Sequence, residues 1–277
     1  MKPPLPLCCH SAAFELMKRQ VAAVHSPDAL IEGAIAISLH QLQDTNQDYI
    51  DRVLQSYADT VRARVRGNQQ QALIAHLHDF LFEDLGFHVS EEYYDPNACY
   101  LPFTLKHKHG LPITLCLIYK AVADRIGVRC SGVGLPGHFV VTVECDGKNM
   151  LVDVADKGRV ITPGDARHRM QAILGDEIKW SEDFLEPVSN LHWLTRLMQN
   201  VMHIFAANRE YCHVAAMLEM EMLLWPTQTH LQRDLALVLA RLGMSHPASL
   251  WLNEYLSTNP DDPQKDDLVE LLDKLSA

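Results

Sequence analysis

The sequence predicts an α+β protein in which helical parts flank a central helix and an antiparallel hairpin. Three observations lead to this class. Apolar residues recur at helical spacing over most of residues 11–86 and of 189–277. Residues 112–127 begin with proline, end with glycine and contain only three charged side chains, which is typical of a buried helix. Residues 138–154 instead alternate in polarity around Asp146-Gly147, a hairpin turn signal.

The N-terminal part is expected to hold several helices. Residues 1–10 contain three prolines and are expected to form a disordered leader. Asp28 provides a helix start, and further helices are expected over 44–65 and 69–85, each with an apolar stripe. Residues 88–110 are expected to be irregular, because turn-forming and aromatic residues replace the helical pattern there.

The C-terminal part is expected to be all-helical and repetitive. Trp225-Pro226 and Asn259-Pro260 lie 34 residues apart, which is the period of tetratricopeptide repeats. Small or β-branched residues, Val214 and Ala248, stand at the same distance before the two prolines. Two such repeats are fewer than the three or so that are needed for independent stability, so the upstream domain should support them. The expected helix pairs are 194–208 with 214–224, and 231–242 with 248–256.

These patterns divide the chain into three parts. A leader (1–10) is followed by a central domain (11–188) and a C-terminal domain of tetratricopeptide-type helices (189–277). Within the central domain we expect a helical part, 11–90, and a core, 91–188, which holds the buried helix and the hairpin.

Charge and composition exclude several classes of function. The net charge of −11 argues against a surface for nucleic acid or anionic lipid, because phosphate binding needs a basic patch. No uncharged stretch approaches the ~18–20 residues of a membrane span, and the N-terminus does not resemble a signal peptide. The seven cysteines are odd in number and lack CxxC spacing, so we expect reduced thiols. The sequence therefore indicates a cytoplasmic protein that binds neither nucleic acid nor membrane.

His138 and Asp153 are candidate site residues, because the hairpin register brings them together. If Asp146-Gly147 is a two-residue turn, Val140 faces Asp153. His138 shares a sheet face with Val140 and becomes a diagonal neighbour of Asp153, at about 7–8 Å. The carboxylate can then fix the tautomer of the imidazole, as the third member of a catalytic triad does. The alternative is a pair that only satisfies two polar groups near the core.

Cys116 is the candidate nucleophile, since it is the only thiol on the central helix. A helix N-terminus favours a thiolate, and a histidine can take the proton. Cys116 lies about one turn beyond the helix start, where this effect has mostly faded, so a buried apolar thiol is the competing interpretation. Thr114 lies closer to the start, but a threonine nucleophile needs a well-placed base.

No cofactor and no metal site is predicted. His107 and His109 precede the central helix, with His138 as a conceivable third ligand, but the adjacent lysines disfavour a cation. The role of this histidine pair stays open. The GxGxxG spacing over 132–137 precedes a strand instead of opening a helix, so it does not fit a nucleotide-binding loop.

Four sequence blocks carry a family resemblance: 93–101, 110–116, 125–128 and, most specifically, Gly132-Val-Gly-Leu-Pro-Gly-His-Phe139. From about residue 28 to the end, the chain resembles the bacterial SirB-like proteins. The resemblance implies a transglutaminase-like (papain-like) core joined to C-terminal tetratricopeptide repeats. It also implies that His138 and Asp153 match the catalytic histidine and aspartate of the superfamily.

The same resemblance implies that the motif cysteine is missing. Active relatives have Gly-x-Cys at the helix start, and alignment on Gly110 places Pro112 or Ile113 there. Cys116 falls where relatives more often have serine, and Val154 replaces the proline that follows the aspartate in the family.

The retained histidine and aspartate, together with the missing motif cysteine, leave two possible functions. The first is a degenerate transglutaminase-like protein that binds a protein or peptide partner through its C-terminal repeats. The alternative is a thiol-dependent hydrolase or acyltransferase that uses Cys116, His138 and Asp153.

Overall fold

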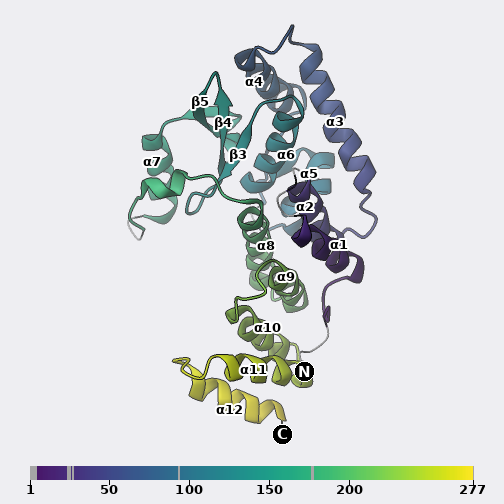
Figure 1. Cartoon of the computed structure of the whole chain (residues 1–277), viewed down its shortest axis with the longest axis vertical. Coiled ribbons are helices and arrows are strands. Elements are labelled where there is room, and N and C mark those ends of the chain that lie inside the picture. The colour runs from purple at the N-terminus through teal and green to yellow at the C-terminus, as the bar shows by residue number, and fades with distance from the viewer. Residues whose placement is uncertain (1–4, 24–25, 27, 93, 176–177, 277) are drawn as a thin grey trace. The chain divides into compact units, whose positions relative to one another are not determined.

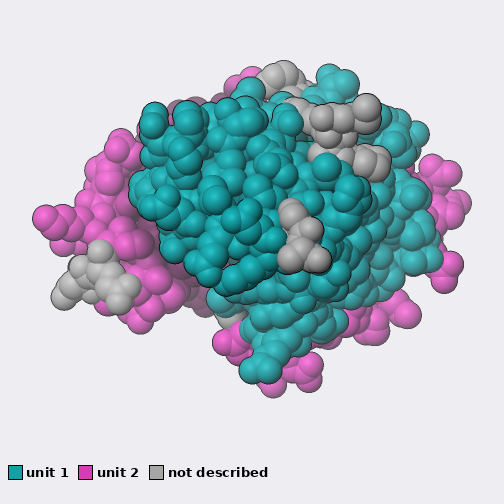
Figure 2. Space-filling model, turned by 90° about the horizontal axis from the view of Figure 1, so that it is seen from below, with its two compact units in different colours: residues 1–43, 194–277 teal, residues 44–193 magenta. Residues whose placement is uncertain are grey.

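The computed structural model describes residues 5–23, 26, 28–92, 94–175 and 178–276. The first four residues of the expected leader and Tyr93 of the first resemblance block lie outside these ranges. The chain divides into two compact units, shown in different colours in Figure 2. Unit 1 combines residues 1–43 with 194–277, and unit 2 is residues 44–193.

This division differs from the expected domain boundaries. Helices α1 (Ser11–Ala22) and α2 (Ala29–Leu39) belong to unit 1 with the C-terminal helices, and not to the domain that holds the hairpin. The reason is tertiary packing: α1 lies against α2 and against α9 (Tyr211–Leu224), about 190 residues further along the chain. The apolar stripe of a helix reveals that it is buried but not which partner buries it.

Residues 7–10 of the expected disordered leader make specific contacts in the structure. The backbone N–H groups of Leu7, Cys8 and Cys9 donate hydrogen bonds to the carboxylate of Glu219 on α9. His10 then enters α1, and its own N–H donates to His40. Residues 7–10 are therefore held by specific contacts.

Unit 2 begins with the expected helices. They are α3 (Gln47–Ala63), capped by the side chain of Asn46, and α4 (Gln70–His78), which continues as a π-helical turn over Asp79–Asp84. The segment expected to be irregular, 88–110, is more ordered than the sequence indicated. It forms β1 (His88–Val89), a 3₁₀ turn (Pro96–Cys99), α5 (Leu101–His107) and β2 (His109–Gly110). These elements are too short to show a periodic pattern.

The central helix is α6 (Pro112–Arg125), as predicted. Proline occupies its first turn, where its missing N–H is not needed, and Gly127 beyond its end has a φ of +83°. Most of its side chains are buried, since α6 packs against α3 and α5 and against strands β3 and β4 of the sheet. Figure 1 shows α6 beside these strands.

The four strands of the sheet are β3 (Cys130–Val133), β4 (Val140–Cys145), β5 (Lys148–Asp153) and β6 (Arg159–Ile161). They pair antiparallel in the order β3-β4-β5-β6. Cys145 faces Lys148 across the two-residue turn, so the predicted register is confirmed. Both turn residues, Asp146 and Gly147, have positive φ, which matches a type I′ turn.

After the sheet, α7 (Pro163–Leu174) begins with a capping box, in which Thr162 and Asp165 satisfy each other's backbone N–H groups. The aromatic ring of Trp193 packs against that of Phe139, with ring centroids 4.7 Å apart. Gly132 permits this contact, because a Cβ there would lie 2.3 Å from the Trp193 ring.

The helices of unit 1 continue with α8 (Asn190–Ala207, within unit 1 from Leu194 on), α9, α10 (His230–Arg241), α11 (Ser245–Thr258) and α12 (Lys265–Ser276). The first four correspond to the predicted helix pairs. Within the described ranges, no helix has both the length and the apolar character that a membrane crossing requires.

The backbone of unit 1 repeats with an offset of 34 residues. Glu210 and Met244, which precede α9 and α11, have φ/ψ values of −90°/63° and −84°/62°. Trp225 and Asn259, which follow these helices, have values of −127°/64° and −131°/65°. The spacing of the two proline motifs therefore corresponds to a repeated backbone geometry.

Histidines connect three elements of unit 1. The N–H of His10 donates to Nδ1 of His40 at 3.3 Å, and Nε2 of His40 lies 2.9 Å from Nδ1 of His213. His213 in turn lies 3.7 Å from the carboxylate of Glu210. Because Nδ1 of His40 accepts a hydrogen bond, its ring proton is on Nε2 and the ring is neutral.

Candidate functional site

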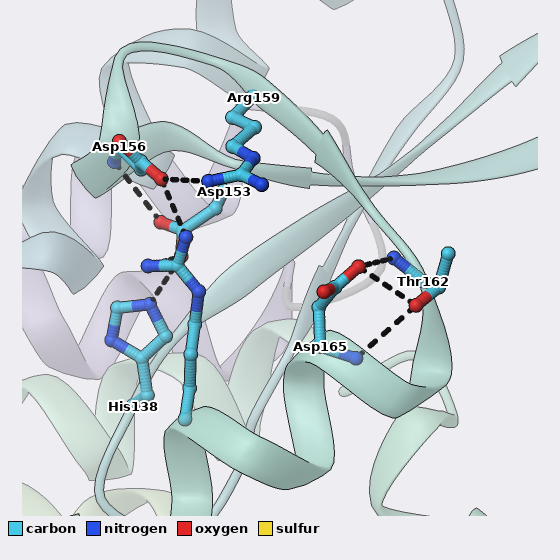
Figure 3. Close-up of polar contacts among 7 residues, drawn as sticks. His138, Asp153, Asp156, Arg159, Thr162 and Asp165 are labelled. Carbon is cyan, nitrogen blue, oxygen red and sulfur yellow. Dashed lines mark hydrogen bonds and ion pairs between the residues drawn. The ribbon is translucent and has the colours of Figure 1, made fainter. Parts of the chain in front are cut away.

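The structure brings His138 and Asp153 together. His138 follows a tight turn, in which its N–H bonds to the carbonyl of Leu135, and it lies two residues before β4 begins. Asp153 is the last residue of β5. The Nε2 atom of His138 is 2.8 Å from Oδ2 of Asp153, and Figure 3 shows the imidazole directed at this carboxylate. The side chain of His138 is 10% exposed and that of Asp153 is fully buried.

A third residue of the site, Arg169 on α7, was not predicted. Its Nη1 atom is 2.7 Å from Oδ2 of Asp153, and its Nη2 atom is 2.5 Å from Oδ2 of Asp156. The backbone N–H of Asp156 also donates to the second oxygen of Asp153, at 3.2 Å. Both carboxylate oxygens of Asp153 thus accept hydrogen bonds. No local pattern marks Arg169, because only the packing of α7 brings it to the end of β5.

These contacts keep Asp153 ionised. Burial acts to raise the pKa of its carboxyl group, but the hydrogen bond and charge of His138, the charge of Arg169 and the N–H of Asp156 outweigh burial and lower that pKa. An ionised Asp153 accepts the hydrogen on Nε2 of His138 and so fixes the ring orientation. This is the orienting arrangement of a triad, but the same contacts also tie β5 to α7.

Cys116 is not poised as a nucleophile. It lies in the second turn of α6, is fully buried, and its Sγ donates to the backbone carbonyl of Phe139 at 3.6 Å. Burial raises the pKa of this thiol well above its usual value, and nearby Cys130 and Asp153 raise it further. The thiolate that a nucleophilic mechanism needs is therefore disfavoured.

The start of α6 offers no replacement among its described residues. The first two residues of the helix are Pro112 and Ile113, neither of which has a nucleophilic side chain, and Ile113 is buried. Thr114 is also buried, and its hydroxyl donates to the carbonyl of Cys99 at 3.2 Å. Gly110 is needed for packing, since a Cβ there would lie 2.5 Å from the hydroxyl of Thr104.

The histidines before α6 contact aromatic rings. Phe103 stacks on His107 with ring centroids 4.3 Å apart, and the ring of His109 lies 6.1 Å from that of His107. His88, which pairs with His109 across β1 and β2, adds a third ring 5.8 Å from His109. In the described part of the chain, no three histidine, cysteine or acidic side chains are arranged to hold a metal ion.

Comparison with known proteins identifies the family. A family model described as the transglutaminase-like superfamily matches residues 48–199, which is more than half of the chain. The chain belongs to the transglutaminase-like superfamily. The matched region begins in α3, contains His138, Asp153 and Arg169, and nearly coincides with unit 2. Helices α1 and α2 lie outside it, in agreement with the division into units.

Curated relatives of this transglutaminase-like protein are named UPF0162 proteins. One from Xylella fastidiosa (strain 9a5c) is 29% identical over 236 residues, which cover 83% of this chain and 84% of the relative. One from Pasteurella multocida is 26% identical over 211 residues, covering 70% and 74%. One from Pseudomonas aeruginosa is 24% identical over 190 residues, covering 66% and 67%. No solved structure matches the chain significantly.

Proposed function

We propose that this transglutaminase-like protein is non-catalytic and acts by binding a protein or peptide. The environment of Cys116 is the observation that carries the proposal. Its thiol is buried, donates to a backbone carbonyl and has a raised pKa. A nucleophilic thiol instead needs a lowered pKa and contact with its base.

The retained His138–Asp153 pair is consistent with a structural role. Arg169 holds the same oxygen of Asp153 that faces His138, so the carboxylate belongs to a buried ion-pair network. A degenerate site can keep such a network because removing one member leaves the others unpaired. The resemblance to the SirB-like proteins supports the same conclusion. Alignment with active relatives of the superfamily puts Pro112 or Ile113 of this chain where those relatives have the motif cysteine.

Unit 1 is the proposed binding part. The 34-residue offset of its backbone supports an assignment as tetratricopeptide-type repeats, whose stacked helices present extended surfaces to partners. We place the protein in the cytoplasm, which suits its seven free cysteines. The proposed partner is a protein or peptide, and neither a nucleic acid nor a membrane.

Iodoacetamide labelling tests the absence of a catalytic thiol. At neutral pH we expect the native chain to label at the exposed Cys212 and not at Cys116, whereas the unfolded chain labels at all seven cysteines. Mass spectrometry of the digested protein gives the sites, and Cys212 is the internal positive control. If native Cys116 is labelled, and loses this reactivity in His138→Ala, the hydrolase or acyltransferase alternative replaces the proposal.

Site-specific photo-crosslinking tests the binding part. Deletion of 194–277 is unsuitable, because it would also remove the helices that pack against residues 1–43. We instead replace Val269 on α12, which is 38% exposed, by a photo-crosslinking residue, with Ile173 on α7, 54% exposed, as the matched control in unit 2. We expect a discrete cellular protein to crosslink from position 269, also in a His138→Ala background. Crosslinking from position 173 alone, or dependence on His138, would contradict the proposal.

A further inference from the structure

The two helix pairs of unit 1 share a side-chain contact as well as backbone geometry. Between α8 and the end of α9, the indole N–H of Trp225 donates to the hydroxyl of Thr195 at 2.7 Å. The positions 34 residues later hold Asn259 and Thr229, whose side chains form a hydrogen bond of 3.1 Å. Each helix pair is therefore joined through the same two positions, and residues of the two pairs can be compared one by one.

One helical turn away, the equivalent positions carry different chemistry. In the second pair, the guanidinium of Arg233 on α10 lies 5.8 Å from the ring centroid of Tyr255 on α11. The same positions in the first pair hold Gln199 on α8 and Glu221 on α9, and the Gln199 amide donates to Oε1 of Glu221 at 3.4 Å. The second pair thus has an arginine at a position where the first has a neutral amide.

Glu221 is a buried carboxyl group without a cation. It is 5% exposed, and among the residues that the structure describes only Gln199 donates a hydrogen bond to it and none forms an ion pair with it. Burial raises the pKa of Glu221 to about 7, where the bond from Gln199 lowers it and the charge of Asp234 raises it. A buried carboxylate is costly without a cation, so a positive group brought to Glu221 is favoured.

We propose that Glu221 binds an arginine side chain of the partner, at the place in the first helix pair that corresponds to Arg233 in the second. The inference rests on the proposed binding function of unit 1 and names the chemistry of its ligand, a basic peptide segment. Guanidinium is weakly hydrated and binds carboxylates in a bidentate manner, which suits a mostly buried partner. Gln199 is exposed and its hydrogen bond is long, so the arginine replaces it as the donor.

The charges of unit 1 complement a basic partner. Asp234, on the helix that packs beside α9, has a side chain that is 37% exposed. Further along the row of helices in Figure 1, residues 261–274 contain six acidic and two basic side chains. A segment that places one arginine at Glu221 therefore meets further negative groups, which favour its approach.

Two fluorescent peptide libraries test the proposal on the full-length protein. One has arginine between four random uncharged residues on each side, and the other has citrulline there, which keeps the shape without the charge. By fluorescence anisotropy we expect the arginine library to bind roughly tenfold more tightly. Glu221→Gln should remove this preference. Glu270→Gln, which removes an exposed carboxylate of α12, is the matched control and should keep it.

The wild type binding both libraries equally, or neither of them, would overturn the arginine site. An unchanged preference in Glu221→Gln would do the same.

Gln199→Arg tests the site without removing its carboxylate. The exposed position tolerates the change, and the variant gives the first helix pair the cation that the second already has. The new guanidinium should pair with Glu221, lower the pKa of this carboxyl group in ¹³C NMR titrations and abolish the preference for the arginine library. A variant that folds normally and keeps the full preference would show that the peptide arginine binds elsewhere.

Crosslinking from position 269 distinguishes this inference from the proposed function. If the same cellular protein crosslinks equally from the wild type and from Glu221→Gln, and the libraries bind alike, unit 1 binds a partner but the arginine site is overturned. If no protein crosslinks and neither library binds, both proposals fail. A crosslink that weakens in Glu221→Gln and not in Glu270→Gln supports both.

Discussion

Asp153→Ala is expected to destabilise the chain by about 3–5 kcal/mol, the cost of removing one partner of a buried ion pair. Asp153 is fully buried, and His138 and Arg169 both direct a nitrogen at its Oδ2, at 2.8 and 2.7 Å. Alanine would leave both partners without this carboxylate and would open space at the end of β5. Urea unfolding followed by circular dichroism measures the change.

The matched control is Asp156→Ala. Asp156 contacts the same arginine, but its side chain is 43% exposed, and exposed ion pairs contribute about 0–1 kcal/mol. If Asp153→Ala lowers the free energy of unfolding no more than Asp156→Ala does, the buried ion-pair network does not stabilise the fold. Because the folded state lowers the pKa of Asp153, its carboxylate stabilises the fold above the usual pKa of 3.8, and the effect is fully present at neutral pH.

Acidification is expected to destabilise unit 1 through His40, by roughly 3 kcal/mol between pH 6.5 and pH 4. Burial, then the neighbouring His213 and His10, lowers the pKa of His40 from 6.5 to about 4. The folded state therefore binds fewer protons than the unfolded state in this window. The stabilising contribution is complete above pH 6.5 and is lost as the pH falls through about 4.

A comparison of wild type with His40→Gln isolates this effect. Glutamine offers a side-chain oxygen to the N–H of His10 but does not titrate. Glu219 and Glu221 contribute the opposite slope, because burial raises the pKa of both carboxyl groups, that of Glu221 to about 7, but they do so equally in both proteins. The free energy of unfolding is measured by urea titration across the window, and that of the wild type should decrease relative to that of His40→Gln as the pH falls. Equal slopes would show that His40 is not the titrating group.

The part of the site predicted from sequence rests on local rules. The two-residue turn at Asp146-Gly147 sets the strand register, and the two-residue periodicity of a strand then places His138 near Asp153. The start and end of α6 follow from a proline and a glycine. The position of Cys116 beyond the first helical turn already indicated a buried thiol, and the structure adds its carbonyl partner.

The part missed depends on residues that are far apart in the chain. Arg169 reaches Asp153 only through the packing of α7, and α5 is too short for its periodicity to be recognised. The expected domain boundary at residue 11 differs from the division into two units, because an apolar helical stripe is equally compatible with either neighbour. The contacts of residues 7–9 do not follow from the local sequence, because their partner, Glu219, lies more than 200 residues away.

The sequence by itself determined the central helix, the hairpin register, the His138–Asp153 pair and the absence of a cysteine at the helix start. Each of these follows from turn geometry or periodicity within a few residues. Tertiary structure decided that the N-terminal helices belong with the C-terminal ones, that Arg169 completes the buried network and that Glu219 binds the backbone N–H groups of residues 7–9. The physical reason is that burial and ion pairing depend on which surfaces pack together. The periodicity of the sequence does not show which surfaces these are.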